Sequence, residues 1–259
     1  MKKLIAIILL VSVAVCVPIL MMNKHKAEKT ADIMEILDSG FSYNENGDIT
    51  YAVVFKNNGD KIISKARFEA EAFDENGEPI EALSEDAIYM QTEEVGPGET
   101  AACVYMFKSA LKEEYGMTEP FKNMPADMSF KAASYTEFSK ESVRNPDLEI
   151  VDYELIEDDF YREDDAVCFK VRVANRGEED FIYDYHNGET NNYMAGNVVY
   201  RDGSGKVIGG ATLGVSSLNH QDEGDLVFKA GEETEIECAS SSGYWPSESQ
   251  ELYLTALYY

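Results

Sequence analysis

The sequence predicts an all-β protein in which two tandem antiparallel β-sandwiches follow one N-terminal apolar helix. Two observations predict the sandwiches: short segments alternate apolar and polar residues, and turns rich in Gly and Asn separate them at regular spacing. A third observation, an internal duplication, predicts that there are two sandwiches. We therefore expect a membrane segment at residues 1–26 and domains at residues 27–145 and 146–259.

The N-terminal residues have the composition of a membrane-insertion signal. A basic tip at residues 1–3 precedes an apolar run at residues 4–22, which a basic stretch at residues 23–26 follows. A helix needs about 20 apolar residues to cross the hydrocarbon, whereas the apolar region of a cleavable signal has about 7–15. The run therefore predicts an uncleaved, single-pass signal anchor with the domains on the extracytoplasmic side of the cell membrane. A cleaved signal peptide and a reversed topology stay open, the latter because lysines follow the run as well as precede it.

Cys16 adds lipidation as a further alternative for this segment. Val13-Ala14-Val15-Cys16 resembles a bacterial lipobox in outline, but Val15 is bulkier than the Gly, Ala or Ser usual before the cysteine. The apolar run also continues past Cys16. The simpler interpretation is that Cys16 is a small hydrophobic residue within a membrane helix.

The first domain is predicted strand by strand from the alternation. Glycine- and proline-containing turns are expected at residues 74–77 and 95–100, and one or two helical turns at residues 108–115. The expected strands lie at residues 34–38, 49–55, 66–73, 101–107 and 130–138.

The second domain repeats the first after a linker at Asn145-Pro146-Asp147. Residues 169–177 repeat residues 51–59, each ending in Asn-x-Gly, for which we expect positive φ at the chain reversal. Further matches occur in the same order, which favours a duplication over chance. They pair residues 148–152 with 34–38, residues 198–208 with 72–80, residues 230–234 with 97–100, and residues 252–259 with the strand around 132–135.

The order of these signals is similar to that of FxLYD-type immunoglobulin-like domains of bacterial exported proteins. Phe73-Asp74, Gly77 and Pro97-Gly98-Glu99 carry the resemblance in the first domain. The second domain departs from it, with Tyr200-Arg201 in place of the aromatic-Asp pair and Ala230 in place of the proline. The resemblance implies two immunoglobulin-like sandwiches that form a noncatalytic surface module, and it implies no particular ligand.

Composition excludes one class of partner. The chain has 49 acidic and 22 basic residues, a net charge of -27, so it repels nucleic acid and anionic lipid. The hydrophobic content of 44% is sufficient for packed cores.

The cysteines outside the membrane segment, Cys103, Cys168 and Cys238, are odd in number. A disulfide between Cys168 and Cys238 would join two sheets, as in antibody-like domains. The alternation opposes it, because Cys168 shares its face with Lys170 whereas Cys238 shares its face with Ile236. Buried thiols are the simpler interpretation, and the absence of a Cys-x-x-Cys pair gives zinc no support.

An acidic loop is the best argument for a metal. Its carboxylates occur in two clusters before the repeated strand, and calcium prefers such hard oxygen ligands, although the spacing does not fit an EF-hand. A solvated loop without metal is the simpler interpretation. The candidate ligands are Asp158, Asp159, Asp164 and Asp165.

Aromatic residues near loops of the second domain form a candidate ligand-binding face for a glycan or a peptide. Rings with polar tips suit such ligands, although tyrosine is also common in strands and Trp245 can simply cap the core. The candidates are Tyr183, Tyr185, Tyr193, Tyr244 and Trp245.

Catalytic motifs have little support. The histidines at positions 25, 186 and 220 lack paired ligand spacing, and no Gly-x-Ser-x-Gly elbow accompanies them. Asp202-Gly-Ser-Gly-Lys206 lies between two expected strands and is interpreted as a hairpin turn. We therefore expect a noncatalytic, cofactor-free interaction or spacer protein whose partner is a protein or glycan at the cell surface. The alternative is carbohydrate- or calcium-dependent binding through the second domain.

Overall fold

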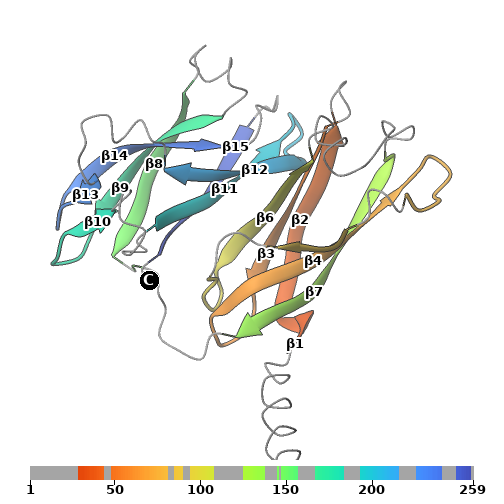
Figure 1. Ribbon diagram of the computed structural model, residues 1–259, viewed down its shortest axis with the longest axis horizontal. Helices are drawn as coiled ribbons and strands as arrows, with labels where there is room; N and C mark the ends of the chain where they lie inside the picture. The colour runs from red at the N-terminus through yellow and green to blue at the C-terminus, as the bar shows by residue number, and fades with distance from the viewer. Residues whose placement is uncertain are drawn as a thin grey trace, which may run out of the picture.

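The computed structural model describes residues 29–43, 48–80, 85–89, 94–107, 125–137, 145, 147–156, 167–183, 193–215, 226–240 and 249–257. Apart from turns and one 3₁₀ turn, η1 (Ala31–Ile33), the described elements are β-strands, and every paired strand is antiparallel. They form two halves that lie side by side (Figure 1). The prediction of an all-β protein with several antiparallel sheets is confirmed for the described residues.

The first half consists of two sheets packed face to face. One sheet has the strand order β1-β7-β4-β5 and the other β2-β3-β6. Apolar side chains from both sheets fill the space between them, including Phe55 and Phe68, whose ring centroids are 5.0 Å apart. The strands are β1 (Lys29–Thr30), β2 (Met34–Tyr43), β3 (Ile49–Asn57), β4 (Ile63–Phe73), β5 (Glu85–Tyr89), β6 (Thr100–Phe107) and β7 (Asp127–Glu137).

The second half has one six-stranded sheet, β15-β11-β12-β14-β9-β8, and a short pair, β10-β13. The large sheet folds over its own core, because β12 and β14 share just three residue pairs and its two edges approach each other. The hydroxyl of Tyr153 on the β8 edge accepts from Leu252 N–H and donates to Gln250 C=O on the β15 edge, each at 3.4 Å. The strands are β8 (Leu148–Ile156), β9 (Cys168–Asn175), β10 (Phe181–Tyr183), β11 (Tyr193–Arg201), β12 (Val207–Val215), β13 (Leu226–Phe228), β14 (Glu233–Ser240) and β15 (Ser249–Leu257).

The alternation predicted for β9 holds in the structure. Phe169, Val171 and Val173 are buried in the core of the second half, whereas Lys170 and Arg172 lie on the outer face. The strand β3 differs, because it is buried along almost its whole length. Both of its faces are covered, one by the core of the first half and the other by the second half.

The duplication is visible in the hydrogen bonds of two buried asparagines. Asn57 Nδ2 donates to the carbonyls of Lys61 and Val95 at 2.8 and 2.9 Å, and its Oδ1 accepts from Gly59 N–H at 2.9 Å. Asn175 makes the same three bonds at 2.8, 2.8 and 2.9 Å, to Glu179, Phe228 and Gly177. In each half the asparagine side chain therefore ties the end of one strand to two neighbouring segments.

The expectation of positive φ at Asn-x-Gly is wrong. Among the described residues, positive φ occurs instead at turn glycines such as Gly98 and Gly231, and at Lys65. At Gly59 a Cβ would lie 2.8 Å from Ile33 Cδ1, the end of a side chain that can shift to accept it. The asparagine carboxamide closes the turn by hydrogen bonding, which leaves the backbone in an ordinary conformation.

The turns after β4 and β11 are also equivalent. Asp74 Oδ1 accepts from the N–H groups of Asn76 and Glu78, and Asp202 Oδ1 accepts from those of Ser204 and Lys206. Asp202 therefore corresponds to Asp74. The sequence alignment that placed Tyr200-Arg201 opposite Phe73-Asp74 is therefore wrong by one residue. The second half keeps the aspartate, and Arg201 stands where the first half has the aromatic residue.

The halves join through a buried interface. The outer face of β2-β3-β6 packs against the outer face of β11-β12-β15, and we call these the first and second joining faces. Buried polar groups pair across it, including Asn197 Nδ2 with Ala102 C=O at 2.9 Å. The apolar contacts come from Ala52, Val54, Ala102, Val104, Val199, Val207 and Tyr253.

Two expected helical segments lie outside the described residues: the apolar run at residues 4–22, with Cys16, and the helical turns at residues 108–115. Within the described part of the chain, no helix combines the length and apolar character that a membrane crossing requires.

Candidate interaction surface

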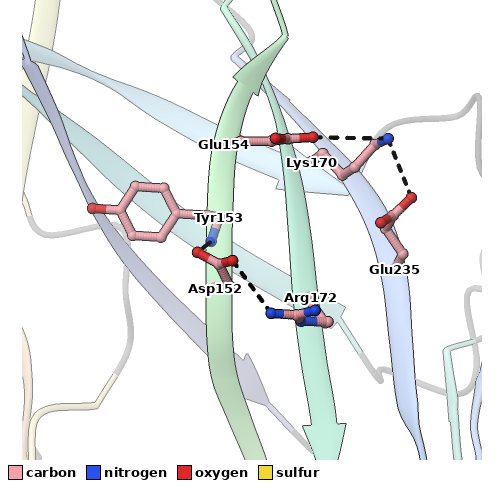
Figure 2. A pocket seen from close by; sticks show the side chains of 6 residues that line it. All are labelled: Asp152, Tyr153, Glu154, Lys170, Arg172 and Glu235. Atoms are coloured by element: carbon pink, nitrogen blue, oxygen red, sulfur yellow. Dashed lines mark hydrogen bonds and ion pairs between the residues drawn. The ribbon is translucent and has the colours of Figure 1, made fainter.

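The outer face of β8, β9 and β14 carries a hollow lined by charged side chains, and we call it the ladder face. The hollow is lined by Asp152, Tyr153, Glu154, Lys170, Arg172 and Glu235. Figure 2 shows the two basic residues on the central strand, with carboxylates on the strands to either side. The ring of Tyr153 points away from them, toward the neighbouring edge of the sheet.

Cross-strand register produces this arrangement. Lys170 Nζ lies 3.3 Å from a carboxylate oxygen of Glu235 on β14 and 3.9 Å from one of Glu154 on β8. Arg172 lies 3.3 Å from Asp152 on β8 and 3.5 Å from Glu233 on β14. Each base is therefore placed between two acids that share its face of the sheet: the acid on β8 lies directly opposite the base, and the acid on β14 is a diagonal neighbour.

These ion pairs contribute little to stability. The side chains of Lys170 and Arg172 are 38% and 46% exposed, so water screens the attraction, and an exposed pair contributes about 0.2–1 kcal/mol. Acidic groups outnumber basic ones on this face. The arrangement keeps this face of the sheet hydrated and charged.

Arg201 forms a second charged cluster beside the joining faces. Its guanidinium donates to Asp38 Oδ2 of the other half at 2.6 Å and to Glu251 Oε2 at 2.9 Å. Hydrogen bonding to Asp38, then to Glu251, raises the pKa of Arg201. Burial beneath this cluster, together with the hydrogen bond to Glu251, raises the pKa of the Tyr253 hydroxyl. Arg201 therefore links the two halves through its hydrogen bond to Asp38.

The predicted aromatic face is described in part. Tyr183 is the last residue of β10, and Tyr193 is the first residue of β11, so their backbones belong to different sheets. Their side chains lie outside the described residues, as do Tyr185, Tyr244 and Trp245 entirely. The aromatic ligand face stays a prediction.

The predicted calcium ligands, Asp158, Asp159, Asp164 and Asp165, also lie outside the described residues. Across the ranges that the structure does describe, no group of three or more His, Cys, Asp or Glu side chains is placed to hold a metal ion. The calcium site at residues 157–165 is thus a prediction as well.

Within the described part of the chain, Cys103, Cys168 and Cys238 are buried and form no disulfide. Cys168 on β9 and Cys238 on β14 belong to neighbouring strands of one sheet, so a bond between them would not join two sheets. Cys238 lies opposite Phe169, which places it on the core face of the sheet. Cys168 lies on the opposite face, the one that also carries Lys170. Burial, with neighbouring Cys168 as a smaller cause, raises the pKa of Cys238 to about 12, and burial also raises the pKa of Cys103. Such thiols are poor nucleophiles at neutral pH.

The joining faces were missed from the sequence. One signal was present: Ile49–Asn57 is almost continuously apolar up to Phe55, which is typical of a strand buried on both faces. Its partner β6 has the same character from Ala101 to Phe107. The second joining face gave no such signal, since it includes Asn197, Arg201 and Glu251.

The fold and surface define an all-β protein of two repeated halves joined face to face. No protein family model matches the chain, and none of the curated proteins matches it.

Proposed function

We propose that the chain is a noncatalytic, membrane-anchored cell-surface protein that acts as an interaction or spacer module with two immunoglobulin-like domains. The observation that supports this proposal is the interface between the halves. It is apolar, carries paired buried polar groups and is closed at its side by Arg201 and Asp38. Two halves joined in this way present their outer surfaces in one fixed arrangement, which suits a spacer or a docking platform.

The order in which the chain visits the sheets supports the immunoglobulin-like part of the proposal. After the short strand β1, the chain of the first half places β2 and β3 in one sheet and β4 and β5 in the other, and then returns to each sheet once, with β6 and β7. In the second half the folded sheet has two parts, β8-β9-β14 and β11-β12-β15, and the chain visits them in the same order apart from the short pair β10-β13. Crossing between layers in this way is characteristic of Greek-key sandwiches.

The experiment that tests this function follows the full chain, with a C-terminal epitope, in bacterial cells. We expect the protein to stay with membranes after alkaline carbonate extraction and its epitope to be removed when protease is added to intact cells. Release by carbonate would contradict anchoring, and an epitope digested only after cell lysis would contradict the extracytoplasmic placement.

A second candidate function is ligand binding through the second half, favoured by the concentration of Tyr183, Tyr185, Tyr193, Tyr244 and Trp245 near its loops. Thermal melts with calcium and with a panel of glycans test it, because a ligand that binds the folded state raises the melting temperature. If glycans bind, a glycan raises the melting temperature and Trp245→Ala abolishes that rise. If calcium binds, calcium raises the melting temperature and Asp164→Asn with Asp165→Asn abolishes that rise. A series without any shift would leave the spacer role.

A further inference from the structure

The two halves associate through different faces of the same repeated unit. The first half uses the outer face of β2-β3-β6, whereas the second uses the outer face of β11-β12-β15. Each half also has the counterpart of the face that the other half uses. The counterpart of the first joining face is the ladder face on β8-β9-β14, and that of the second lies on β4, β5 and β7. We call the part on β4 and β7 the β4 face.

The strand registers give the first equivalence residue by residue. In the first half Ala52 is opposite Val104 and Val54 is opposite Ala102, and these four side chains are buried against the second half. The same positions of the second half hold two bases on β9 opposite two acids on β14. The equivalent positions, joining face first, are Ala52 and Lys170, Val54 and Arg172, Ala102 and Glu235, and Val104 and Glu237.

The edge strands β2 and β8 differ in the same way, at Gly40 and its counterpart. A Cβ on Gly40 would lie 1.7 Å from the carbonyl oxygen of Val207, so the contact between halves requires glycine at this position. Gly40 is opposite Ala52, and its counterpart opposite Lys170 is Glu154. A long charged side chain therefore stands on the ladder face where the joining face has none.

The β4 face differs from the second joining face in the same way. On the joining face Asn197 is opposite Tyr253, and on the β4 face Glu69 is opposite Lys131. The Lys131 side chain is 80% exposed and lies 3.7 Å from a Glu69 carboxylate oxygen. The equivalent positions, joining face first, are Asn197 and Glu69, Val199 and Glu71, Arg201 and Phe73, and Tyr253 and Lys131.

We propose that the charges on the ladder face and the β4 face prevent a second copy of this chain from docking in the way the two halves dock. A contact of the ladder face with the β4 face of another copy would be head-to-tail and would leave a free face at each end. Such contacts do not close and produce open chains. With the charged residues in place, the contact would bury acids in excess on both sides and leave Glu154 against backbone, which is strongly unfavourable. The two faces act like the polar caps that end repeat arrays.

The test rebuilds each joining face on its charged counterpart, in the full chain purified in a mild detergent. The protein mass is measured by size exclusion with light scattering, separately for each variant and for their equimolar mixture. The ladder variant carries Glu154→Gly, Lys170→Ala, Arg172→Val, Glu235→Ala and Glu237→Val. The β4 variant carries Glu69→Asn, Glu71→Val, Phe73→Arg and Lys131→Tyr.

We expect each variant alone to remain monomeric, because each has one rebuilt face and no complementary one. The mixture should have twice the monomer mass, and a chain with both sets should form larger, concentration-dependent species. A control ladder variant that keeps the charges, Lys170→Arg with Arg172→Lys, Glu235→Asp and Glu237→Asp, should stay monomeric with the β4 variant.

A mixture that keeps the monomer mass while both variants melt within a few degrees of wild type overturns the proposal. Association of the wild-type chain to the same extent as the mixture overturns it too. If a full variant does not fold, Arg172→Val with Glu235→Ala is tested against Glu71→Val by chemical cross-linking. Cross-linking several-fold above wild type supports the proposal, and cross-linking equal to wild type overturns it.

Discussion

Thr50 and Gly210 bond to each other twice across the buried interface between the two halves. The Thr50 hydroxyl donates to Gly210 C=O at 2.7 Å and accepts from Gly210 N–H at 2.9 Å. One hydroxyl thus satisfies both backbone groups of a residue 160 positions away in the sequence. Since Thr50 is fully buried and Gly210 is buried as well, water cannot replace these bonds.

Thr50→Val should therefore destabilise the chain by about 2–4 kcal/mol, because it leaves a buried N–H and a buried C=O without partners at nearly constant side-chain volume. Denaturant unfolding of the purified full chain measures the effect. Thr50→Ser keeps the hydroxyl and should lose less than half as much. Equal losses for the two variants would show that the methyl group, not the hydroxyl, matters.

Gly40→Ala should lower stability by about 1–3 kcal/mol, because the added Cβ meets the carbonyl oxygen of Val207 and the halves must separate to accept it. Glu154→Ala is the matched control, since it changes the equivalent position of the exposed ladder face. Its effect should stay within about 0.5 kcal/mol. Similar melting temperatures for Gly40→Ala and wild type would contradict the close approach at this point.

The two repeated asparagines should respond alike to mutation. Asn57→Ala and Asn175→Ala each remove one donor from a buried carbonyl, one donor from a partly buried carbonyl and one acceptor from a turn, so each should cost about 2–4 kcal/mol. Equilibrium unfolding of the two single variants checks the equivalence. If one variant loses more than twice as much unfolding free energy as the other, the repeated hydrogen bonds do not stabilise the two halves equally.

Stability should fall in acid through the two turn aspartates. Bonds from Glu78 and Asn76 N–H lower the pKa of Asp74, and bonds from the Ser204 hydroxyl and the Lys206 N–H lower that of Asp202, both from 3.8. An aspartate whose pKa is lower in the folded than in the unfolded state stabilises the fold at pH values above the unfolded-state pKa. This stabilisation is lost as the pH falls through the folded-state pKa. Asp74→Asn with Asp202→Asn keeps an acceptor oxygen without charge. Melting temperatures of this variant should decline less than those of wild type below pH 4; parallel declines would contradict this source of acid sensitivity.

The all-β class and the antiparallel strands could be predicted from local patterns, whereas the contact between halves could not. Strand β9 shows its two faces in its alternation, and the Asp74 turn and its repeat at Asp202 follow from residues close in sequence. The expectation of positive φ at Asn57 failed because its carboxamide bonds to Val95, far along the chain. The joining faces depend on pairs such as Thr50 and Gly210, which nothing in a single strand indicates. The predicted ligand residues other than Tyr183 and Tyr193 lie outside the described part of the chain.

We expect the two halves to form one cooperative unit through their joining faces. Hydrogen exchange of the full chain, read by mass spectrometry at increasing denaturant, tests it most directly, because amides of β3 and β9 report on separate halves. If the halves unfold as one unit, β3 and β9 lose protection at the same denaturant concentration, and Thr50→Val lowers that concentration by the same amount for both strands. Loss of protection in one half while the other remains protected, with Thr50→Val affecting β3 alone, would contradict it.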